Sequence, residues 1–407
     1  MVIIFFSDDQ KTCEKKEKTS KVTVYTVTIF LQPVSISIED TPVRSEEPDK
    51  EKLESEADSE KEKSESFSEK SEKKNSDVRS KIVDNGLQRD YDLKSLLGTG
   101  GFAKVYLAKH KHTKETVAIK ALKKEGITST LDAERIHLEK NILELATREQ
   151  NPFLVGLFAS FQTEHHLCLA IDYCAGGDLY KQVEEGPFPQ EKAVFYAGCI
   201  VLGLQFLHKN NIIHRDIKPE NILIASDGYT KITDFGLAKK TETYGGITNT
   251  FCGTRYYMAP EIVKKDCHTK SVDWWALGIV IYEMIRGVPP FLGQKQIVLE
   301  KIKNEEPPYP SVLSVVAVSL IQGLLKKDPM ERLGASDRDA EEVMESSFFK
   351  KLDFDALSEK KVTPPFIPQN KKQGCFERMF SRQKQVLMSD SEWKPALKLV
   401  EREFKDF

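Results

Sequence analysis

The chain has 407 residues, with 60 basic and 63 acidic side chains, so its formal net charge is −3. This near balance gives no case for nucleic acid or a membrane surface as the main partner. Its length predicts two or more folding units. No apolar run reaches the roughly 18–20 residues of a membrane span, and the opening MVIIFF lacks the basic flank of a secretory signal. The seven dispersed cysteines favour reduced thiols in the cytoplasm, with the nucleus as an alternative.

The first 90 residues divide into two segments. Residues 1–38 contain a β-branched stretch that predicts two strands broken at Pro33, or equally an extended segment outside any domain, and no role follows from it. Residues 39–90 form a linker. It is almost entirely Glu, Lys, Ser and Asp up to position 81, which is too polar to offset the entropy of ordering, so the sequence predicts disorder.

From Tyr91 onward, apolar residues recur at the spacings of strands and helices. YDLKSLLGTGGFAKVYLAKH predicts a strand, a glycine turn and a second strand, and ETVAIKALKK predicts a third. A helix is expected over residues 131–147, followed by strands in FLVGLFASFQ and HLCLAIDY. After Gly177 the pattern is mostly helical, with helices predicted around residues 203–207, 274–285 and 312–325. The sequence therefore predicts a small β-rich lobe, a larger helical lobe and a ligand cleft near residues 172–177.

The glycine turn is the first candidate for a binding site. Glycines let backbone N–H groups approach phosphate oxygens closely. A strand follows the turn, which excludes both a dinucleotide fingerprint and a Walker loop, since each leads into a helix. Taken alone, the turn is equally a tight hairpin. The residues concerned are Leu97, Gly98, Thr99, Gly100, Gly101, Phe102 and Val105.

A lysine follows fifteen residues after Val105. Lys120 ends the apolar strand VAIK, where an unpaired cation is costly to bury. A phosphate together with a carboxylate would satisfy it, and Glu139 in the predicted helix is the candidate carboxylate. Glu139 could instead be an exposed acid on the helix face.

The segment HRDIKPEN, followed by DFG thirteen residues later, carries the chemistry. Asp216 could accept the proton of a hydroxyl nucleophile. Asn221 and Asp234 could supply oxygen ligands to Mg²⁺, and Lys218 could neutralise charge on a phosphoryl group. Singly, each is a polar group in a surface loop, but five fixed positions in eight are rare by chance.

These motifs resemble those of eukaryotic protein kinases over Tyr91–Phe349. The glycine loop, VAIK, HRDxKxxN, DFG and APE occur in that family's order and spacing. The resemblance implies an α+β fold with two lobes, the small one β-rich with one main helix and the large one mainly helical. It implies ATP and Mg²⁺ as cofactors, with Lys120 paired to Glu139, Asp216 as base and Asn221 and Asp234 as metal ligands.

The resemblance also assigns further residues. The hinge that binds adenine would be Ile171, Asp172 and Cys174, and the ring would lie between Val105, Ala118 and Leu223. Glu261 should pair with Arg332, and Asp273 should brace the catalytic loop. An ATP-binding or empty pseudokinase scaffold is the alternative, although Lys120, Asp216, Asn221 and Asp234 are all present.

The C-terminal residues 350–407 resemble the tail of the group that includes cyclic-nucleotide-dependent kinases and protein kinase C, with the protein kinase N branch most similar. Such a tail is expected to wrap the small lobe. Phe404 and Phe407 would dock in a groove beside the Glu139 helix and bias an on/off equilibrium. Phe376 would cover the ATP site. Ordinary core packing is the alternative for these phenylalanines.

The switch is predicted at Thr250 in TNTFCGT. A phosphate there would add about −1.5 to −2 charge and bind basic groups. Arg215, Lys239 and Arg135 align with the family's phosphate-binding pocket. The expected upstream partner is an activating kinase of the phosphoinositide-dependent type, and the chain itself is expected to be a monomer.

Substrate choice is predicted from two sets of residues. Lys218 and Thr254 match the serine/threonine pattern. Acidic residues at positions that bind arginine in this group predict protein substrates with Arg or Lys before the Ser or Thr that is phosphorylated. They are Asp178, Glu220 and Glu300, and Asp178 also lies at the ATP site. Arg255 stands where the family usually has proline, and Ala103 replaces the third glycine of the loop.

Overall fold

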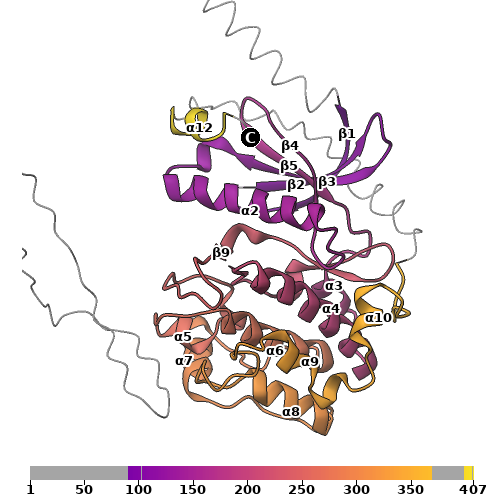
Figure 1. Ribbon diagram of the computed structural model, residues 1–407, viewed down its shortest axis with the longest axis vertical. Coiled ribbons are helices and arrows are strands. Elements are labelled where there is room, and N and C mark those ends of the chain that lie inside the picture. Colours follow the sequence, from indigo (N-terminus) through magenta and orange to yellow (C-terminus); the bar gives the residue numbers. More distant parts are fainter. Residues whose placement is uncertain (1–89, 102, 369–397, 406) are drawn as a thin grey trace, which may run out of the picture. The chain divides into compact units, whose positions relative to one another are not determined.

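A computed structural model describes residues 90–101, 103–368, 398–405 and 407. The predicted N-terminal strands, the linker up to residue 89, Phe102 and Phe376 lie outside these residues. In Figure 1 the sheet, α2 (Thr130–Arg148) and α12 (Lys398–Glu403) form one half of the described chain, and the helices from α3 to α10 form the other half. Within the described ranges, no helix is both long and apolar enough to cross a membrane.

The first half is a five-stranded antiparallel sheet in the order β1-β2-β3-β5-β4. Both faces of the sheet carry buried side chains: Leu169 of β5 belongs to the main hydrophobic cluster, and Ile119 of β3 and Ala170 of β5 belong to a second cluster. The strands are β1 (Tyr91–Thr99), β2 (Ala103–His110), β3 (Thr116–Lys123), β4 (Leu157–Gln162) and β5 (His166–Asp172).

One long helix, α2 (Thr130–Arg148), covers this sheet. It begins at a capping box, in which the Ser129 side chain accepts from the Asp132 N–H and the Asp132 side chain accepts from the Ser129 N–H. Ile142, Leu143 and Ala146 recur at helical spacing and are buried. A short 3₁₀ turn, η1 (Lys124–Gly126), precedes the helix.

The second half is helical with short two-stranded pairings. β6 pairs with β9, and β7 pairs with β8. The helices are α3 (Leu179–Glu184), α4 (Gln190–Lys209), α5 (Pro260–Val263), α6 (Ser271–Arg286), α7 (Lys295–Asn304), α8 (Val315–Leu324), α9 (Ala340–Met344) and α10 (Phe354–Ser358). The short strands are β6 (Ile212–Ile213), β7 (Ile222–Ile224), β8 (Thr230–Ile232) and β9 (Lys239–Lys240).

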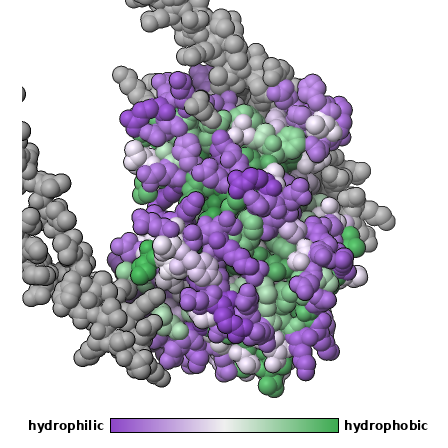
Figure 2. Space-filling view, viewed as in Figure 1, coloured by the Kyte–Doolittle hydropathy of each residue, from purple (hydrophilic) through white to green (hydrophobic). Residues whose placement is uncertain are grey.

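The centre of this half is α6, whose residues from Ser271 to Ile285 are all buried. It packs against α4 and α8. Around it, 3₁₀ turns shape the loops: η2 (Pro219–Asn221), η3 (Phe235–Leu237), η4 (Arg255–Tyr257) and η5 (Ser347–Phe349). The viewed face is mainly hydrophilic, with hydrophobic residues visible in smaller areas (Figure 2).

Some element boundaries differ from the sequence predictions. The strand expected from Phe153 begins only at Leu157, because the Gly156 N–H donates to the Asp172 carboxylate and not to a neighbouring strand. The helix expected from residue 312 begins at Val315, because Ser314 is its N-cap and accepts from the Ala317 N–H. The helix expected around residues 203–207 extends over the whole of α4.

The last described segment, α12 (Lys398–Glu403), lies beside α2. Val400 and Phe404 are buried there in a small cluster with Ile127, Ala133 and Leu167. This part of the C-terminal segment therefore packs on the small lobe, in the region where the docking of Phe404 and Phe407 was predicted.

Candidate active site

A chain of ion pairs joins β3, α2 and the DFG segment. The Lys120 ammonium lies 2.6 Å from the Glu139 carboxylate and 2.8 Å from Asp234 Oδ1. Burial would lower the pKa of Lys120, but these two carboxylates outweigh it and raise the pKa. Lys120 in turn lowers the pKa of Asp234. Lys120 and Asp234 are therefore held in their charged forms.

The Asp216 carboxylate is held by donors from both sides. Its Oδ1 accepts from the Thr254 N–H at 2.9 Å and the Thr254 hydroxyl at 2.7 Å. Its Oδ2 accepts from the Lys218 ammonium at 2.6 Å and the Asn221 amide at 3.1 Å. These donors fill the roughly four lone-pair sites of a carboxylate. A substrate hydroxyl must therefore displace one of them.

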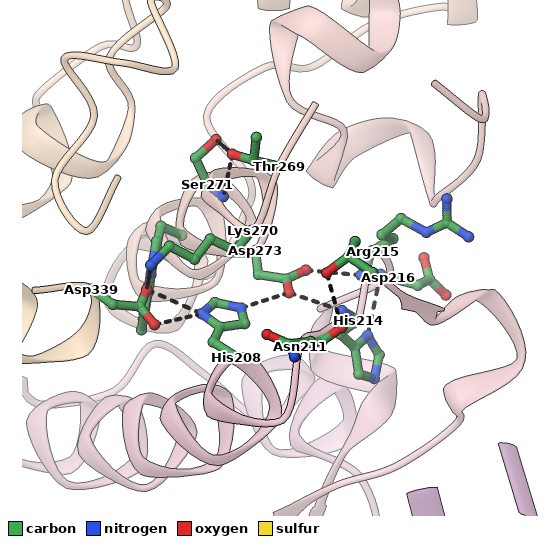
Figure 3. A network of polar contacts seen from close by, with 12 residues as sticks. His208, Asn211, His214, Arg215, Asp216, Thr269, Lys270, Ser271, Asp273 and Asp339 are labelled. Atoms are coloured by element: carbon green, nitrogen blue, oxygen red, sulfur yellow. Dashed lines mark hydrogen bonds and ion pairs between the residues drawn. The ribbon is translucent and has the colours of Figure 1, made fainter. Parts of the chain in front are cut away.

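The backbone under Asp216 is fixed from α6. Asp273 accepts from the N–H groups of His214 at 2.9 Å and Arg215 at 2.8 Å (Figure 3). Arg215 has φ +68°, a left-handed conformation that is unfavourable for a side chain of its size. Such strain persists where surrounding contacts determine the conformation, and the two hydrogen bonds to Asp273 supply those contacts.

Asn221 and Asp234 fit a magnesium site. The Thr233 N–H donates to the Asn221 carbonyl at 3.0 Å, so the residue before Asp234 lies beside Asn221. Among the described residues, Asn221 Oδ1 and Asp234 Oδ2 have no hydrogen bond, and the Asp234 side chain is 49% exposed. One amide oxygen and one carboxylate oxygen are thus available, and oxygen is the ligand type that Mg²⁺ requires.

The glycine turn between β1 and β2 leaves open space. Its glycines are not among the residues with positive φ, so strain does not explain them. A Cβ at Gly98 or Gly101 would meet no atom of the described residues within 4 Å. The missing side chains therefore leave room over the backbone, as close approach by a phosphate requires. Ala103 lies within β2 and is not among the positive-φ residues either.

The apolar residues predicted to bind adenine all belong to, or pack against, one extended hydrophobic cluster. Ala118 is buried in the main hydrophobic cluster, and Leu97, Val105 and Leu223 pack against it. Cys174 is buried, which raises the pKa of its thiol to about 12. The short coil that follows Asp172 links β5 to α3, as expected for a hinge. The Asp172 carboxylate accepts from the Lys231 ammonium at 2.6 Å.

Within the described structure, the predicted substrate acids have separate partners. Asp178 caps α3 by accepting from the Lys181 N–H and pairs with the Lys181 ammonium at 2.8 Å. Glu300 on α7 accepts from Lys303 and Asn304. Glu220 is exposed beside the catalytic loop.

Sequence reasoning missed Glu283. This buried carboxylate of α6 accepts from the Tyr257 hydroxyl at 2.7 Å. Burial, with a smaller contribution from the charge of Glu220, raises its pKa to about 7. An acid inside the apolar run WWALGIVIYEMI was the available signal.

The residues around the predicted switch come from several elements. Thr250 is half-buried and follows Thr248, whose hydroxyl accepts from Arg215 at 3.5 Å. Burial lowers the pKa of Arg215, and the charge of Arg135 adds a smaller lowering. Lys239 is exposed on β9.

Arg255, which replaces the usual proline of the family, packs beside a neighbouring tyrosine. Arg255 begins η4, and its guanidinium lies 5.3 Å from the centroid of the neighbouring Tyr256 ring. The side chain is half-buried. Arg255 lies in the segment between Thr250 and Glu261. In kinases of this group, its position is expected to line the pocket for the substrate residue that follows the phosphoacceptor.

The segment after Thr250 is anchored by the pair expected from the resemblance. The buried Arg332 guanidinium forms a bidentate contact with Glu261 at 2.6 and 2.9 Å. On the other side of Thr250, Phe235 of the DFG segment is buried and packs edge-on against His214. The loop that carries Thr250 is therefore held at both of its ends.

Comparison with known proteins decides the family. Residues 91–349 match the model described as the protein kinase domain. The chain belongs to the protein kinase family. The two-lobed α+β kinase fold predicted from the motifs is thereby confirmed, with the five-stranded sheet in one lobe and the helices in the other.

The relatives also confirm the resemblance to the protein kinase N and protein kinase C branch. The chain is 43% identical over 297 residues to serine/threonine-protein kinase N2 of Danio rerio, covering 73% of this chain and 30% of the relative. It is 44% identical over 281 residues to serine/threonine-protein kinase N3 of Mus musculus, covering 69% and 32%. Protein kinase C-like 1 of Saccharomyces cerevisiae is 44% identical over 301 residues, covering 74% and 26%. The chain thus spans about a third or less of the length of these relatives.

Proposed function

We propose that this kinase domain transfers the γ-phosphoryl group of ATP to serine or threonine of protein substrates. The observation that carries this proposal is the arrangement around Asp216, where Lys218, Asn221 and Thr254 converge on one carboxylate. The names of the relatives, which are serine/threonine kinases, support the same acceptor class.

Each residue of the site would have a separate role in binding ATP or in transferring its phosphoryl group. Bound Mg²⁺ would neutralise phosphate charge, with Asn221 and Asp234 holding it. Lys120 would bind the phosphates of ATP. When Lys218 turns from Asp216 to the phosphoryl group, it frees a lone-pair site on the carboxylate. The substrate hydroxyl would donate to that site and pass its proton to Asp216.

A basic segment before the phosphoacceptor is the proposed feature of its substrates. Glu220 and buried Glu283 lie close enough for their charges to interact, and this interaction raises the pKa of Glu283 after the larger effect of burial. The same two acids also raise the pKa of Tyr180, after the larger effects of Glu184 and of burial. An arginine of the substrate would relieve the repulsion between these acids, which is a direct reason for its selection.

Phosphorylation of Thr250 by an upstream kinase is the proposed activating step. The charges of Arg215 and Arg135 repel each other, and a phosphate beside them would relieve that repulsion. In protein treated beforehand with an activating kinase, Thr250→Ala should therefore lower kcat at least tenfold. Thr243→Ala, an exposed residue of the same loop, is the matched control and should keep the wild-type kcat. Full activity of Thr250→Ala would contradict this step.

The proposed activity is tested with radiolabelled ATP and an arginine-containing peptide. Asp216→Asn keeps the size of the side chain but removes its charge, and incorporation should fall by a factor on the order of 10² to 10⁴. Asp227→Asn, a surface acid paired with Lys360, is the control and should keep wild-type activity. Equal incorporation by wild type and Asp216→Asn would overturn the mechanism, and no incorporation by either would favour the pseudokinase alternative.

A further inference from the structure

A tyrosine of the loop before Thr250 reaches a buried acid of the large lobe. The Tyr244 hydroxyl donates to Asp339 Oδ2 at 2.9 Å. The Lys270 ammonium lies 3.8 Å from the centroid of the Tyr244 ring and 3.4 Å from Asp339 Oδ1. Asp339 itself is only 3% exposed. A mostly exposed loop is thus tied to the interior through one hydroxyl.

The acid at the other end of this hydrogen bond belongs to the network that holds the catalytic loop. Asp339 accepts from His208 Nδ1 at 3.1 Å and from the Trp274 indole at 2.8 Å. His208 Nε2 donates to Asp273 at 3.0 Å (Figure 3). Asp273 is the residue that accepts from two backbone N–H groups of the catalytic loop. Three hydrogen bonds therefore lead from Tyr244 to Asp273, beside the catalytic carboxylate.

The charges of this network depend on each member. Asp339 and Asp273 are two buried carboxylates, and His208 and Lys270 form ion pairs with them. The Tyr244 hydroxyl adds a donor without adding charge. Buried polar networks of this kind strengthen or weaken together. Loss of one donor to Asp339 changes how tightly Asp339 holds His208, and through it Asp273.

Among the described residues, few other hydrogen bonds attach this loop to the large lobe. Residues 242–247 are exposed or half-buried, and Gly245 has φ +72°. The neighbouring attachments are a backbone bond from Thr241 to Asn211 on one side and backbone bonds between Thr248 and His268 on the other. The Tyr244 hydroxyl therefore fixes the middle of a span that leads directly to the predicted switch.

We propose that Tyr244 is a positioning residue for phosphoryl transfer, and that it acts through Asp339, His208 and Asp273 on the backbone that carries Asp216. This inference rests on the proposed kinase activity. It assigns Tyr244 a role in kcat and not in ATP binding, because within the described structure no group of this network contacts the ion pairs that join β3, α2 and the DFG segment.

The first test is Tyr244→Phe, which removes only the hydroxyl. We expect kcat to fall about 3- to 10-fold, the net effect of one typical intramolecular hydrogen bond, with KM for ATP unchanged. Ile247→Ala, an exposed residue of the same loop, and Asp337→Asn, an exposed acid near Asp339, should both keep the wild-type kcat. An unchanged kcat in Tyr244→Phe would overturn the proposal.

A double-mutant cycle and hydrogen exchange complete the test. If the hydroxyl acts through Asp339, adding Tyr244→Phe to Asp339→Asn should lower kcat much less than it does in the wild type. In Tyr244→Phe, amide exchange should accelerate in peptides covering residues 212–217 as well as 241–250. Additive effects on kcat, or exchange that changes only in 241–250, would contradict the coupling. The exchange result holds even if the wild type proves inactive, so it separates this inference from the proposed function.

Discussion

Glu283 is a buried carboxyl whose ionisation changes near neutral pH. Burial raises its pKa to about 7, with the Tyr257 hydroxyl opposing the rise and Glu220 contributing to it. Below pH 7 the carboxyl is mainly neutral, and above pH 7 it is mainly charged. If it binds an arginine of the substrate, as we propose, the affinity for basic peptides should follow this ionisation.

The prediction concerns KM for an arginine-containing peptide. Between pH 6 and pH 8, KM should fall severalfold in the wild type, because the charged carboxylate attracts the guanidinium. In Glu283→Gln this fall should be much smaller, and KM at pH 8 should be higher than in the wild type. Glu331→Gln, an exposed acid elsewhere in the lobe, is the matched control. A wild-type pH dependence retained in Glu283→Gln would exclude Glu283 from peptide binding.

The residues near Asp216 show how far sequence could predict the site. Lys218 and Asn221 lie two and five residues from Asp216, so a local motif was sufficient to find them. The apolar run around Glu283 could have marked it as a buried acid, but no local motif joins it to its partner Tyr257, which lies 26 positions away. The contact of the Tyr244 hydroxyl spans 95 positions and left no local pattern.

At the scale of elements, α12 lies on α2 in the region predicted for the tail phenylalanines. The Phe404 ring is stacked on His137 with centroids 4.6 Å apart, and the His137 ring nitrogen lies 3.0 Å from the Glu403 carbonyl. The Gln162 amide donates to the Phe404 carbonyl at 2.9 Å. The Lys140 ammonium lies 4.9 Å from the centroid of the Phe407 ring. Since α2 also carries Glu139, this contact can influence the pair that Glu139 forms with Lys120.

Phe404→Ala should weaken the docking of α12 on α2. Removal of a buried phenylalanine ring typically costs about 3–5 kcal/mol, which is enough to release a short helix held by few contacts. We expect faster amide exchange in residues 398–405 and a lower kcat, because Glu139 loses its support. Lys405→Ala, an exposed neighbour, should change neither quantity. Release of α12 without any change in kcat would show that the contact is structural only.

The element predictions succeeded where side-chain periodicity was the deciding force. The strands of the small lobe and α2 follow directly from the apolar spacing of their residues. The two-residue strands β6 and β9 were not predicted, because their pairing joins Ile212–Ile213 to Lys239–Lys240 across the DFG segment. Side-chain caps such as Ser314 and Asp178 set boundaries that periodicity alone placed too early or left undefined.

At the scale of the whole kinase domain, ion pairs connect the two lobes and the elements within the large lobe. Lys120 of the small lobe pairs with Asp234 of the large lobe. Within the large lobe, fully buried His208 joins α4 to Asp273 on α6 and to Asp339 before α9. Burial would lower the pKa of His208, but the two carboxylates outweigh it and raise the pKa to about 9.

Stability should therefore depend on pH through His208. Its folded pKa, about 9, lies above the ordinary value of 6.5, so the stabilisation is fully present below pH 6.5 and is lost as pH rises through 9. The shift corresponds to about 3 kcal/mol in the free energy of unfolding. Denaturation midpoints at pH 6.5 and 9.5 should show this loss in the wild type and a flatter pH dependence in His208→Gln. His112→Gln, an exposed histidine, should retain the wild-type dependence. Parallel pH curves for wild type and His208→Gln would mean that the histidine is not the charged link between Asp273 and Asp339, and Tyr244 would then have no cation through which to act on the catalytic loop.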